Sequence, residues 1–444
     1  MDLNALERGP RDDDYLFGPR AAWFAFAMTL ALMVFDYVDR QIIVSLFPFI
    51  KAEWGLSDAQ LGSLVSVVSL TVALGALPVA LIADRASRVK SIVVMATIWS
   101  LATISCMWTR GYGSLAAARA AVGLGEAGYG SVGAALIASH FPARMRGALL
   151  AGFFASASIG SVLGVVLGGY IASHWGWHAA FGVVGLPGLA VALLYLKVRD
   201  YRTVQLESGL DAKRRSLGQA ARHIVHLLVR ARTMLWVCIG GAAQLIVVSA
   251  LWSWMPSFLN RVHGVAPAQA GAKAALVVLA GAAGSVIWGA LVDRAGARHP
   301  RRKLAAMALL CVASMAVLAY AFGGAHEPAA QFGWIVLGGF LATCSVGPVS
   351  AIVIDVIHPG VRATGSSVLA LFQNLFGLAV GPFLVGLLSD RIGLPSALAA
   401  VPLASVLAAA AFVLAARSYE ADRARAADPA EVPAPAAAPV ARGA

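Results

Sequence analysis

The chain has 444 residues, of which 59% are hydrophobic and only 13% are charged, and its mean hydropathy is +0.78. So few charges cannot cover the surface of a water-soluble protein of this length, and soluble classes of protein are excluded. The net charge of +12 could suggest nucleic acid as a partner. The basic residues instead follow a topological pattern between apolar stretches, and we expect no nucleic-acid binding.

Apolar stretches of about 20 residues, the length that crosses the hydrocarbon core of a bilayer, recur along the chain. They predict an all-α membrane protein with twelve transmembrane helices. The expected spans are 21–49, 58–83, 91–110, 112–138, 147–173, 178–197, 234–258, 268–292, 303–322, 331–355, 363–388 and 395–416. Lys and Arg residues gather in alternate connections, which by the positive-inside rule predicts an inner-membrane protein with both termini in the cytoplasm.

The four cysteines lie inside apolar spans and lack metal-ligand spacing, so we expect them to be packing residues. We expect no metal and no other cofactor. The sequence Gly123-x-Gly125-x-x-Gly128 matches the dinucleotide-binding fingerprint by letter, but no strand precedes it. We interpret these glycines as close packing of a membrane helix.

One long polar segment, 198–233, divides the spans into two halves of six helices, 21–197 and 234–416. We interpret it as a cytoplasmic linker with some amphipathic helix lying along the membrane surface. Residues 1–20 are predicted to form a polar cytoplasmic leader. The Ala/Pro-rich residues 417–444 are predicted to be a disordered cytoplasmic tail.

A charged motif is repeated in the two halves. Asp84-Arg85-x-x-Arg88 follows the second span, and Asp293-Arg294 follows the eighth. The first copy resembles the loop signature of the major facilitator transporters, G-x-x-x-D-R-x-G-R-R/K. That resemblance implies two six-helix halves in parallel orientation with a substrate site between them.

The repeated motif also suggests a conformational latch. A carboxylate at a helix end with arginines around it forms charge-assisted pairs between neighbouring helices. Such pairs could hold the cytoplasmic side shut and break when it opens. The residues of this predicted latch are Asp84, Arg85, Arg88, Asp293 and Arg294. The alternative is that these charges only set the topology.

Ionisable residues inside spans are costly and usually functional. Span one contains Asp36, Asp39 and Arg40, which share one helix face at positions i, i+3 and i+4. Span four contains Arg119 and Glu126, which share a face two turns apart. From their depths we expect the two charged faces to meet in the outer half of the bilayer and at its middle.

These charges predict proton coupling through Asp39, Glu126 and Arg119. Burial favours the protonated form of a carboxyl group, and a nearby arginine favours the ionised form. Moving an arginine toward or away from a carboxylate would therefore change proton affinity. An anionic substrate could compete for the same arginines. The alternative is a static ion network that only fixes helix packing, and Asp36 is left open between the two roles.

The same residues resemble one branch of the major facilitators, the Spinster transporters. The likeness is carried by Tyr37-x-Asp39-Arg40 in span one and Arg119-x-x-x-Gly-x-Gly-Glu126-Ala-x-Tyr129 in span four. Spinster transporters move lysophospholipids and sphingoid phosphates. The resemblance implies that Asp39, Arg119 and Glu126 match their proton-linked and head-group residues, with Arg40 beside them. Asp36 stands where an asparagine is expected, so the local charge departs from the pattern.

The second half offers aromatic and weakly polar residues, among them Gln244, Trp252, Trp254 and Phe372. A cavity charged on one side and apolar on the other would suit an amphiphile. The predicted substrate-binding residues are Arg40, Arg119, Glu126, Tyr129 and Asn374.

The sequence therefore predicts a monomeric, proton-coupled transporter of an amphiphilic anion that works by alternating access, with membrane lipids, its substrate and protons as partners. Related anion:cation symporters share the span-one motif and Gly-Glu-Ala in span four, so proton-driven symport of small organic anions is the alternative. A third hypothesis is that the protein is a membrane receptor that does not transport its ligand. Catalytic and ATP-binding motifs are missing from the sequence, and we expect no enzymatic activity.

Overall fold

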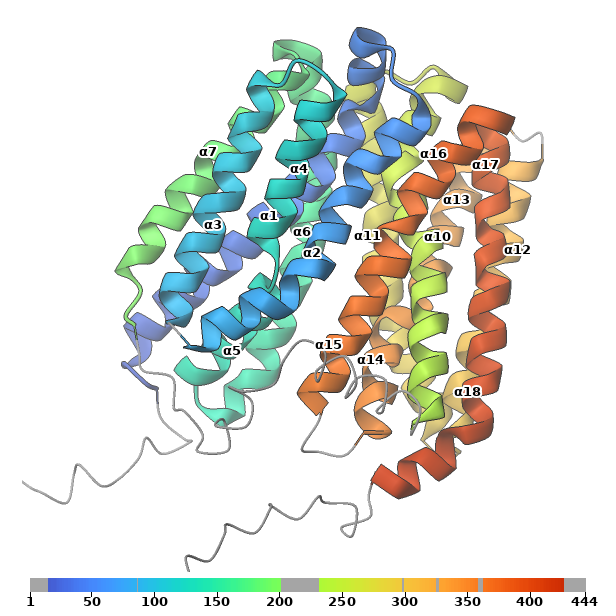
Figure 1. The fold of residues 1–444 in the computed structure, drawn as a ribbon. Helices are drawn as coiled ribbons and strands as arrows, with labels where there is room; N and C mark the ends of the chain where they lie inside the picture. Colours follow the sequence, from blue (N-terminus) through green and yellow to red (C-terminus); the bar gives the residue numbers. More distant parts are fainter. Residues whose placement is uncertain are drawn as a thin grey trace, which may run out of the picture.

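The computed structural model describes residues 15–85, 87–200, 231–297, 299–324, 327–357 and 362–426. Within these ranges every regular element is helical, and twelve helical segments are long and apolar enough to cross a membrane. The predicted all-α, twelve-span architecture is confirmed. The spans form two bundles of six that stand side by side (Figure 1).

The first bundle contains spans one to six. Its helices are α1 (Pro19–Trp54), α2 (Asp58–Arg85), α3 (Arg88–Ser105), α4 (Tyr112–Glu126), α5 (Tyr129–His140), α6 (Ala143–Trp175) and α7 (Trp177–Leu194). The fourth span consists of α4 and α5 together. Short 3-10 segments, η2 (Cys106–Trp108) and η3 (Tyr195–Lys197), end the third and sixth spans.

The second bundle contains spans seven to twelve. Its helices are α10 (Arg232–His263), α11 (Pro267–Gly296), α12 (Arg301–Gly323), α13 (Pro328–Ala342), α14 (Val346–Asp355), α15 (Arg362–Phe372), α16 (Val380–Ile392), α17 (Leu394–Ala400) and α18 (Ala404–Ala426). Three of its spans are irregular. The 3-10 segments η4 (Thr343–Ser345) and η7 (Val401–Leu403) interrupt the tenth and twelfth spans, and a π-helix, η6 (Gln373–Leu378), interrupts the eleventh.

The twelfth span extends further than predicted. α18 continues to Ala426, so the stretch 417–426 of the predicted disordered tail is helical. It is held by hydrogen bonds to distant residues: the Tyr419 hydroxyl donates to Asp355 Oδ2 at 2.9 Å, and Asp422 Oδ2 accepts from the Thr233 backbone N–H at 2.8 Å. The prediction was wrong there because composition does not reveal such long-range contacts. Residues 427–444, and the amphipathic helix predicted in the linker at 201–230, lie outside the described residues.

Among the described residues, the buried apolar side chains form three clusters, one of which is shared between the two bundles. The shared cluster contains Leu46 and Phe47 of α1 together with Leu251 and Trp254 of α10, and the rings of Phe47 and Trp254 lie 5.2 Å apart. The other two clusters each stay within one bundle. All four cysteines are buried within the spans, as predicted for packing residues.

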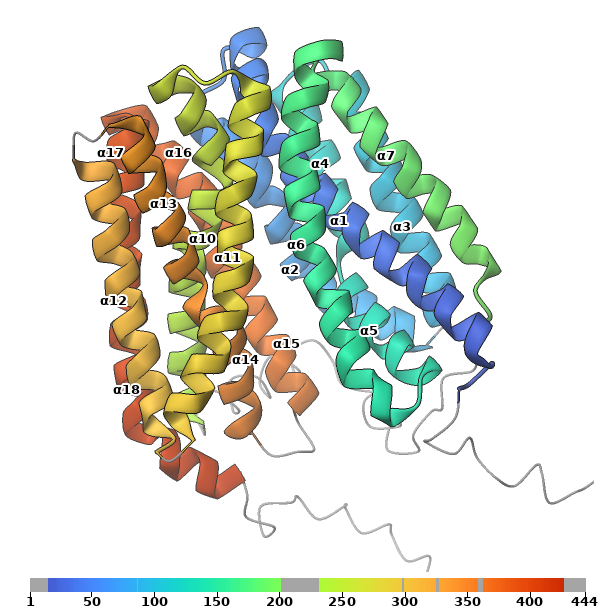
Figure 2. The same ribbon diagram turned by 180° about the vertical axis from the view of Figure 1, so that it is seen from behind.

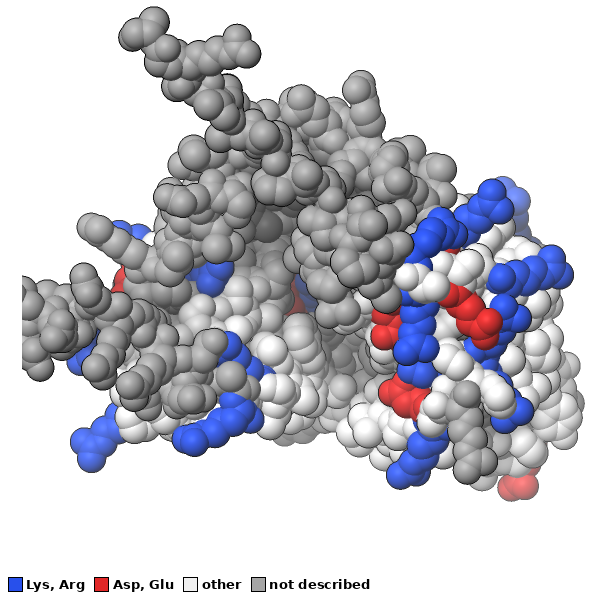
Figure 3. All heavy atoms as spheres, turned by 90° about the horizontal axis from the view of Figure 1, so that it is seen from below, with Lys and Arg blue, Asp and Glu red and all other residues white. Residues whose placement is uncertain are grey.

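The shared cluster lies toward the ends of α1 and α10 that precede α2 and α11, so the bundles are joined at that end of the molecule. Both ribbon views show the bundles close together there and separated at the opposite end (Figures 1 and 2). We call these the joined end and the open end. Seen from the open end, basic side chains gather on both bundles, and the described surface is hollowed between them (Figure 3).

Glycines allow the close approach at the joined end. A Cβ on Gly62 of α2 would lie 2.2 Å from the carbonyl oxygen of Pro382 in α16. In the reverse direction, a Cβ on Gly386 of α16 would lie 2.2 Å from the carbonyl oxygen of Asp58 in α2. Neither contact leaves room for a side chain, so these two helices pack backbone to backbone across the two halves.

Candidate functional site

The fourth span is interrupted at Glu126. α4 ends at this residue, α5 begins at Tyr129, and Gly128 between them has a φ of +82°. A residue with a side chain would be strained in this left-handed conformation, and a Cβ at Gly128 would also lie 3.3 Å from Val79 Cγ1. The glycine therefore permits α4 to stop within the span. The Glu126 carboxylate at its end lies against α1.

Two further glycines bring α4 close to its neighbours. A Cβ on Gly123 would lie 2.1 Å from Thr71 Oγ1 of α2, and one on Gly125 would lie 2.6 Å from the Trp99 backbone nitrogen of α3. The glycine pattern in this span is therefore a packing pattern, as predicted, and not a nucleotide-binding loop.

Arg119 of α4 pairs with Asp39 of α1. Its NH1 donates to Asp39 Oδ1 at 3.1 Å and to the Asp39 backbone carbonyl at 3.2 Å. Thr103 of α3 donates its hydroxyl to the other carboxylate oxygen, Asp39 Oδ2. All three side chains are buried. Arg119 Nε and NH2 have no hydrogen-bond partner among the described residues.

Arg40 of α1 forms the second group of charges. Its NH2 lies 3.0 Å from Glu126 Oε2, and its Nε lies 3.5 Å from Asp36 Oδ1. The Arg40 side chain keeps 18% of its surface exposed, whereas that of Glu126 keeps none. Arg40 is therefore the member of this group with the most surface open to a solute.

The two charged faces meet as predicted, and the structure gives the pairing that the sequence left open. Arg119 pairs with Asp39, and Glu126 pairs with Arg40. We call the five residues Asp36, Asp39, Arg40, Arg119 and Glu126 the charge cluster. It holds three carboxyl groups and two guanidinium groups, so full ionisation would leave a net charge of −1 away from water. Binding one proton would neutralise the cluster, which makes it chemically suited to proton exchange.

Tyr129 was also predicted to bind substrate. Its hydroxyl donates to the Thr29 carbonyl at 2.6 Å, and its ring lies 5.2 Å from that of Trp99 and 6.2 Å from that of Phe153. The side chain is fully buried in the core of the first bundle. Its role in binding stays a prediction, and in this conformation its hydroxyl is engaged by the backbone.

The predicted polar residues of the second bundle are dispersed. Asn374 lies in the π-helix η6 and donates to the Ala370 carbonyl at 2.9 Å. Gln244 donates to Ser314 Oγ at 3.2 Å and to the Ala342 carbonyl at 3.0 Å, at the break in the tenth span. Among the described residues, no hydrogen bond or ion pair joins Asn374 to the charge cluster, and its binding role stays a prediction.

The predicted latch lies at the open end. The side chains of Asp84 and Arg85 fall outside those that the structure describes. Arg88 donates to Ser139 Oγ at 3.2 Å, and Asp293 lies 2.9 Å from Lys303 Nζ of the neighbouring helix α12. Both contacts stay within one bundle. Arg294 lies in the last turn of α11. The role of these residues as a latch stays a prediction.

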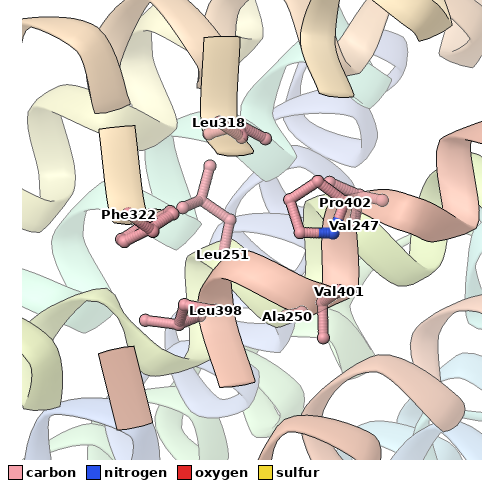
Figure 4. A pocket seen from close by; sticks show the side chains of 8 residues that line it. All are labelled: Val247, Ala250, Leu251, Leu318, Phe322, Leu398, Val401 and Pro402. Atoms are coloured by element: carbon pink, nitrogen blue, oxygen red, sulfur yellow. The ribbon is translucent and has the colours of Figure 1, made fainter. Parts of the chain in front are cut away.

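A small apolar pocket lies within the second bundle and away from the charge cluster (Figure 4). Its wall contains no polar side chain that could orient a solute. The lining residues are Val247, Ala250, Leu251, Leu318, Phe322, Leu398, Val401 and Pro402. We interpret it as a packing gap between α10, α12 and the break in the twelfth span.

An ion cluster that was not predicted from the sequence lies at the joined end. Asp58, at the start of α2, lies 2.5 Å from Lys51 Nζ and 2.7 Å from Arg261 NH1 of α10. Its Oδ2 also accepts from the Ser389 hydroxyl at 2.5 Å. In return, Asp390 of α16 accepts from the backbone N–H groups of residues 58 and 59 at 2.8 and 2.9 Å. This joined-end ion cluster connects the two bundles.

The sequence does contain one signal for it. Ser57 and Gln60 form a capping box, in which the Gln60 N–H donates to Ser57 Oγ and the Ser57 N–H donates to Gln60 Oε1. The box predicts where α2 begins. It does not predict that Asp390, from the other half, completes the cap.

We expect Asp58→Asn to loosen the joined end. The change removes the charge that Lys51 and Arg261 share, and charged hydrogen bonds are worth about 1.5–3 kcal/mol each. That loss would shift a two-state equilibrium roughly tenfold or more toward separation of the bundles. Spin labels at the exposed positions Ala52 and Val262 would report a longer distance.

The matched control is Glu420→Gln, which breaks an exposed ion pair with Arg301 inside one bundle. It should leave the distance between the labels unchanged. A wild-type distance distribution in Asp58→Asn would contradict a holding role for the joined-end ion cluster.

The sequence profile of the Major Facilitator Superfamily matches residues 29–379 and 237–442. An MFS-type efflux pump of Mycolicibacterium smegmatis is 29% identical over 84% of this chain and 86% of its own length. A gallate transporter of Pseudomonas putida is 25% identical, over 85% and 90% of the two chains. Protein spinster homolog 3 of Danio rerio is 24% identical, over 84% and 78%.

Among solved structures, the fold is similar to that of a bacterial homologue of the human lysosomal transporter Spinster in an inward-facing, unoccupied conformation. The TM-score is 0.79 at 22% identity, over 91% of this chain and 98% of the other. The resemblance to Spinster proteins noted in the charged motifs is thus confirmed. Since the family profile matches well over half of this chain, the chain belongs to the Major Facilitator Superfamily.

Proposed function

We propose that this protein is a proton-coupled secondary active transporter of an amphiphilic anion, of the lysophospholipid or sphingoid-phosphate type, that works by alternating access. The carrying observation is the charge cluster, in which three buried or nearly buried carboxyl groups face two arginines. Only Arg40 among them keeps appreciable exposed surface. A substrate anion that bound Arg40 would compete with Glu126 for it, which links substrate binding to the charge state of the cluster.

The orientation in the membrane is part of the proposal. Basic residues lie in the first turns of α3 and α12 at the open end, among them Arg88, Lys90, Arg301, Arg302 and Lys303. By the positive-inside rule this end faces the cytoplasm of an inner membrane, with both termini on that side. In this orientation the described conformation is inward-facing, and the joined-end ion cluster closes the outer side.

A small organic anion is the second candidate substrate, and it is favoured by the similarity to the gallate transporter. Arg40 would serve a carboxylate as well as a phosphate. The two candidate substrates differ in the part that carries no charge. An amphiphile has an apolar tail, and the protein must offer an apolar surface to bind it. Exposed Phe376, whose ring lies 5.4 Å from that of Phe372 at the π-helix, would supply such a surface from the second bundle.

Flux measurements on purified protein in liposomes distinguish these candidates. We expect an imposed pH gradient to drive movement of a labelled lysophospholipid, and an excess of gallate not to compete with it. Driven movement of gallate without competition by lysophospholipid would select the alternative. Binding of either compound with no flux of any kind would indicate a receptor and contradict both transport proposals.

A further inference from the structure

Thr103 of α3 has two hydrogen-bond acceptors within reach of a single hydroxyl group. Its Oγ1 contacts Asp39 Oδ2 of α1 and also lies 2.9 Å from the Trp99 carbonyl one turn earlier in its own helix. The hydroxyl has one hydrogen and can donate to only one of them at a time, although its oxygen can accept a further bond. The residue is buried and was not among the predicted site residues.

The two acceptors correspond to the two protonation states of Asp39. When Asp39 is ionised, Thr103 donates to Oδ2 while Arg119 NH1 remains on Oδ1. When a proton binds to Oδ2, the new O–H can donate to Thr103 Oγ1. The threonine hydroxyl then rotates onto the Trp99 carbonyl, a bond that helical threonines commonly make. The Asp39 carboxyl group and the Thr103 hydroxyl therefore stay hydrogen-bonded in both states.

Glu126 is placed differently. Its neighbours among the described residues are the charged side chains of Arg40, at 3.0 Å, and Asp36, and no hydroxyl group bonds to its carboxylate. Asp39 therefore differs from Glu126 in having a neutral hydroxyl partner that can both donate and accept a hydrogen bond.

From this geometry we propose that Thr103 is a positioning residue for proton exchange at Asp39, which rotates its hydroxyl between the Asp39 carboxylate and the Trp99 carbonyl as the proton arrives and leaves. The inference rests on the proposed proton coupling. In this exchange the proton ends on Asp39 Oδ2 and no other covalent bond changes. Among the described residues, the charged groups that act on Asp39 lie on α1 and α4. They are Asp36, Arg40, Arg119 and Glu126. The Cys106 thiol also lies close enough to interact with Asp39.

Thr103→Val tests the proposal, because valine keeps the shape and removes the hydroxyl. The ionised state of Asp39 loses a charge-assisted bond, which is stronger than the neutral bond lost by the protonated state. We therefore expect the pH midpoint of gradient-driven transport to move to higher pH by about one unit. Thr103→Ser keeps the hydroxyl and should restore the wild-type midpoint.

The matched control is Thr71→Val, since Thr71 donates only to backbone carbonyls of its own helix. It should keep the wild-type midpoint. If Thr103→Val is too slow for flux, pH-difference infrared spectra of the protein in liposomes still report the Asp39 carboxyl band, which is assigned by its loss in Asp39→Asn. That band should titrate at higher pH and, with its hydrogen bond gone, move to higher frequency.

Each result is decisive. A wild-type midpoint and band in Thr103→Val overturns the role of Thr103, as does a serine variant that behaves like valine. A wild-type protein whose transport ignores the pH gradient and shows no titrating Asp39 band refutes the proposed proton coupling itself. The failure of the proposed function is thus distinguishable from the failure of this inference.

Discussion

Glu126→Gln should abolish proton-driven transport. Glutamine has nearly the shape of glutamate but can neither bind the transported proton nor carry the charge that holds Arg40 at 3.0 Å. The Glu126 side chain has no exposed surface, so no water takes over its role. We expect accumulation driven by an imposed pH gradient to fall to the rate measured without a gradient.

The measurement is substrate accumulation in liposomes with and without the gradient. Glu420→Gln makes the same chemical change in a half-exposed ion pair with Arg301 and should accumulate substrate like the wild type. Thermal unfolding in detergent checks that both variants are folded. If folded Glu126→Gln protein still follows the gradient at the wild-type rate, Glu126 does not couple protons.

Much of the fold could be predicted from the sequence because a membrane imposes one dominant constraint. Each span must be apolar over about 20 residues, and the chain shows this directly. What could not be predicted are features set by contacts between distant segments. The final turns of α18 are ordered by Asp355 and Thr233, and nothing in the composition of residues 417–426 indicates those partners.

The charge cluster, too, could be predicted only in part. Helical spacing placed Asp39 and Arg40 on one face of α1, and depth placed them opposite α4. Spacing could not tell which arginine pairs with which carboxylate, because that depends on the break at Gly128 and on the approach of α3. Thr103 was missed because a single threonine in an apolar span gives no signal in the sequence. The same holds for the joined-end cluster, whose partners come from both halves.

Arg119→Gln should be among the most destabilising substitutions in the protein. It leaves Asp39 buried beside a neutral partner, and removing one member of a buried ion pair typically costs about 3–5 kcal/mol. Asp39 is 2% exposed and Arg119 is fully buried, so water cannot replace the lost partner. Only the ionised carboxylate needs the countercharge that is lost, so the loss in the free energy of unfolding should grow as the pH rises. Unfolding in detergent at several pH values measures it.

The double variant Asp39→Asn/Arg119→Gln then separates packing from coupling. It removes both charges and should regain most of the lost stability, so the double-mutant cycle should give a large coupling energy. The exposed pair Arg301–Glu420 is the control, with an expected coupling energy below about 1 kcal/mol. A double variant no more stable than Arg119→Gln would contradict the pairing. A stable double variant that still transports with the pH gradient would mean that the Asp39–Arg119 pair serves helix packing alone. A stable one that has lost gradient-driven transport would assign the pair to coupling.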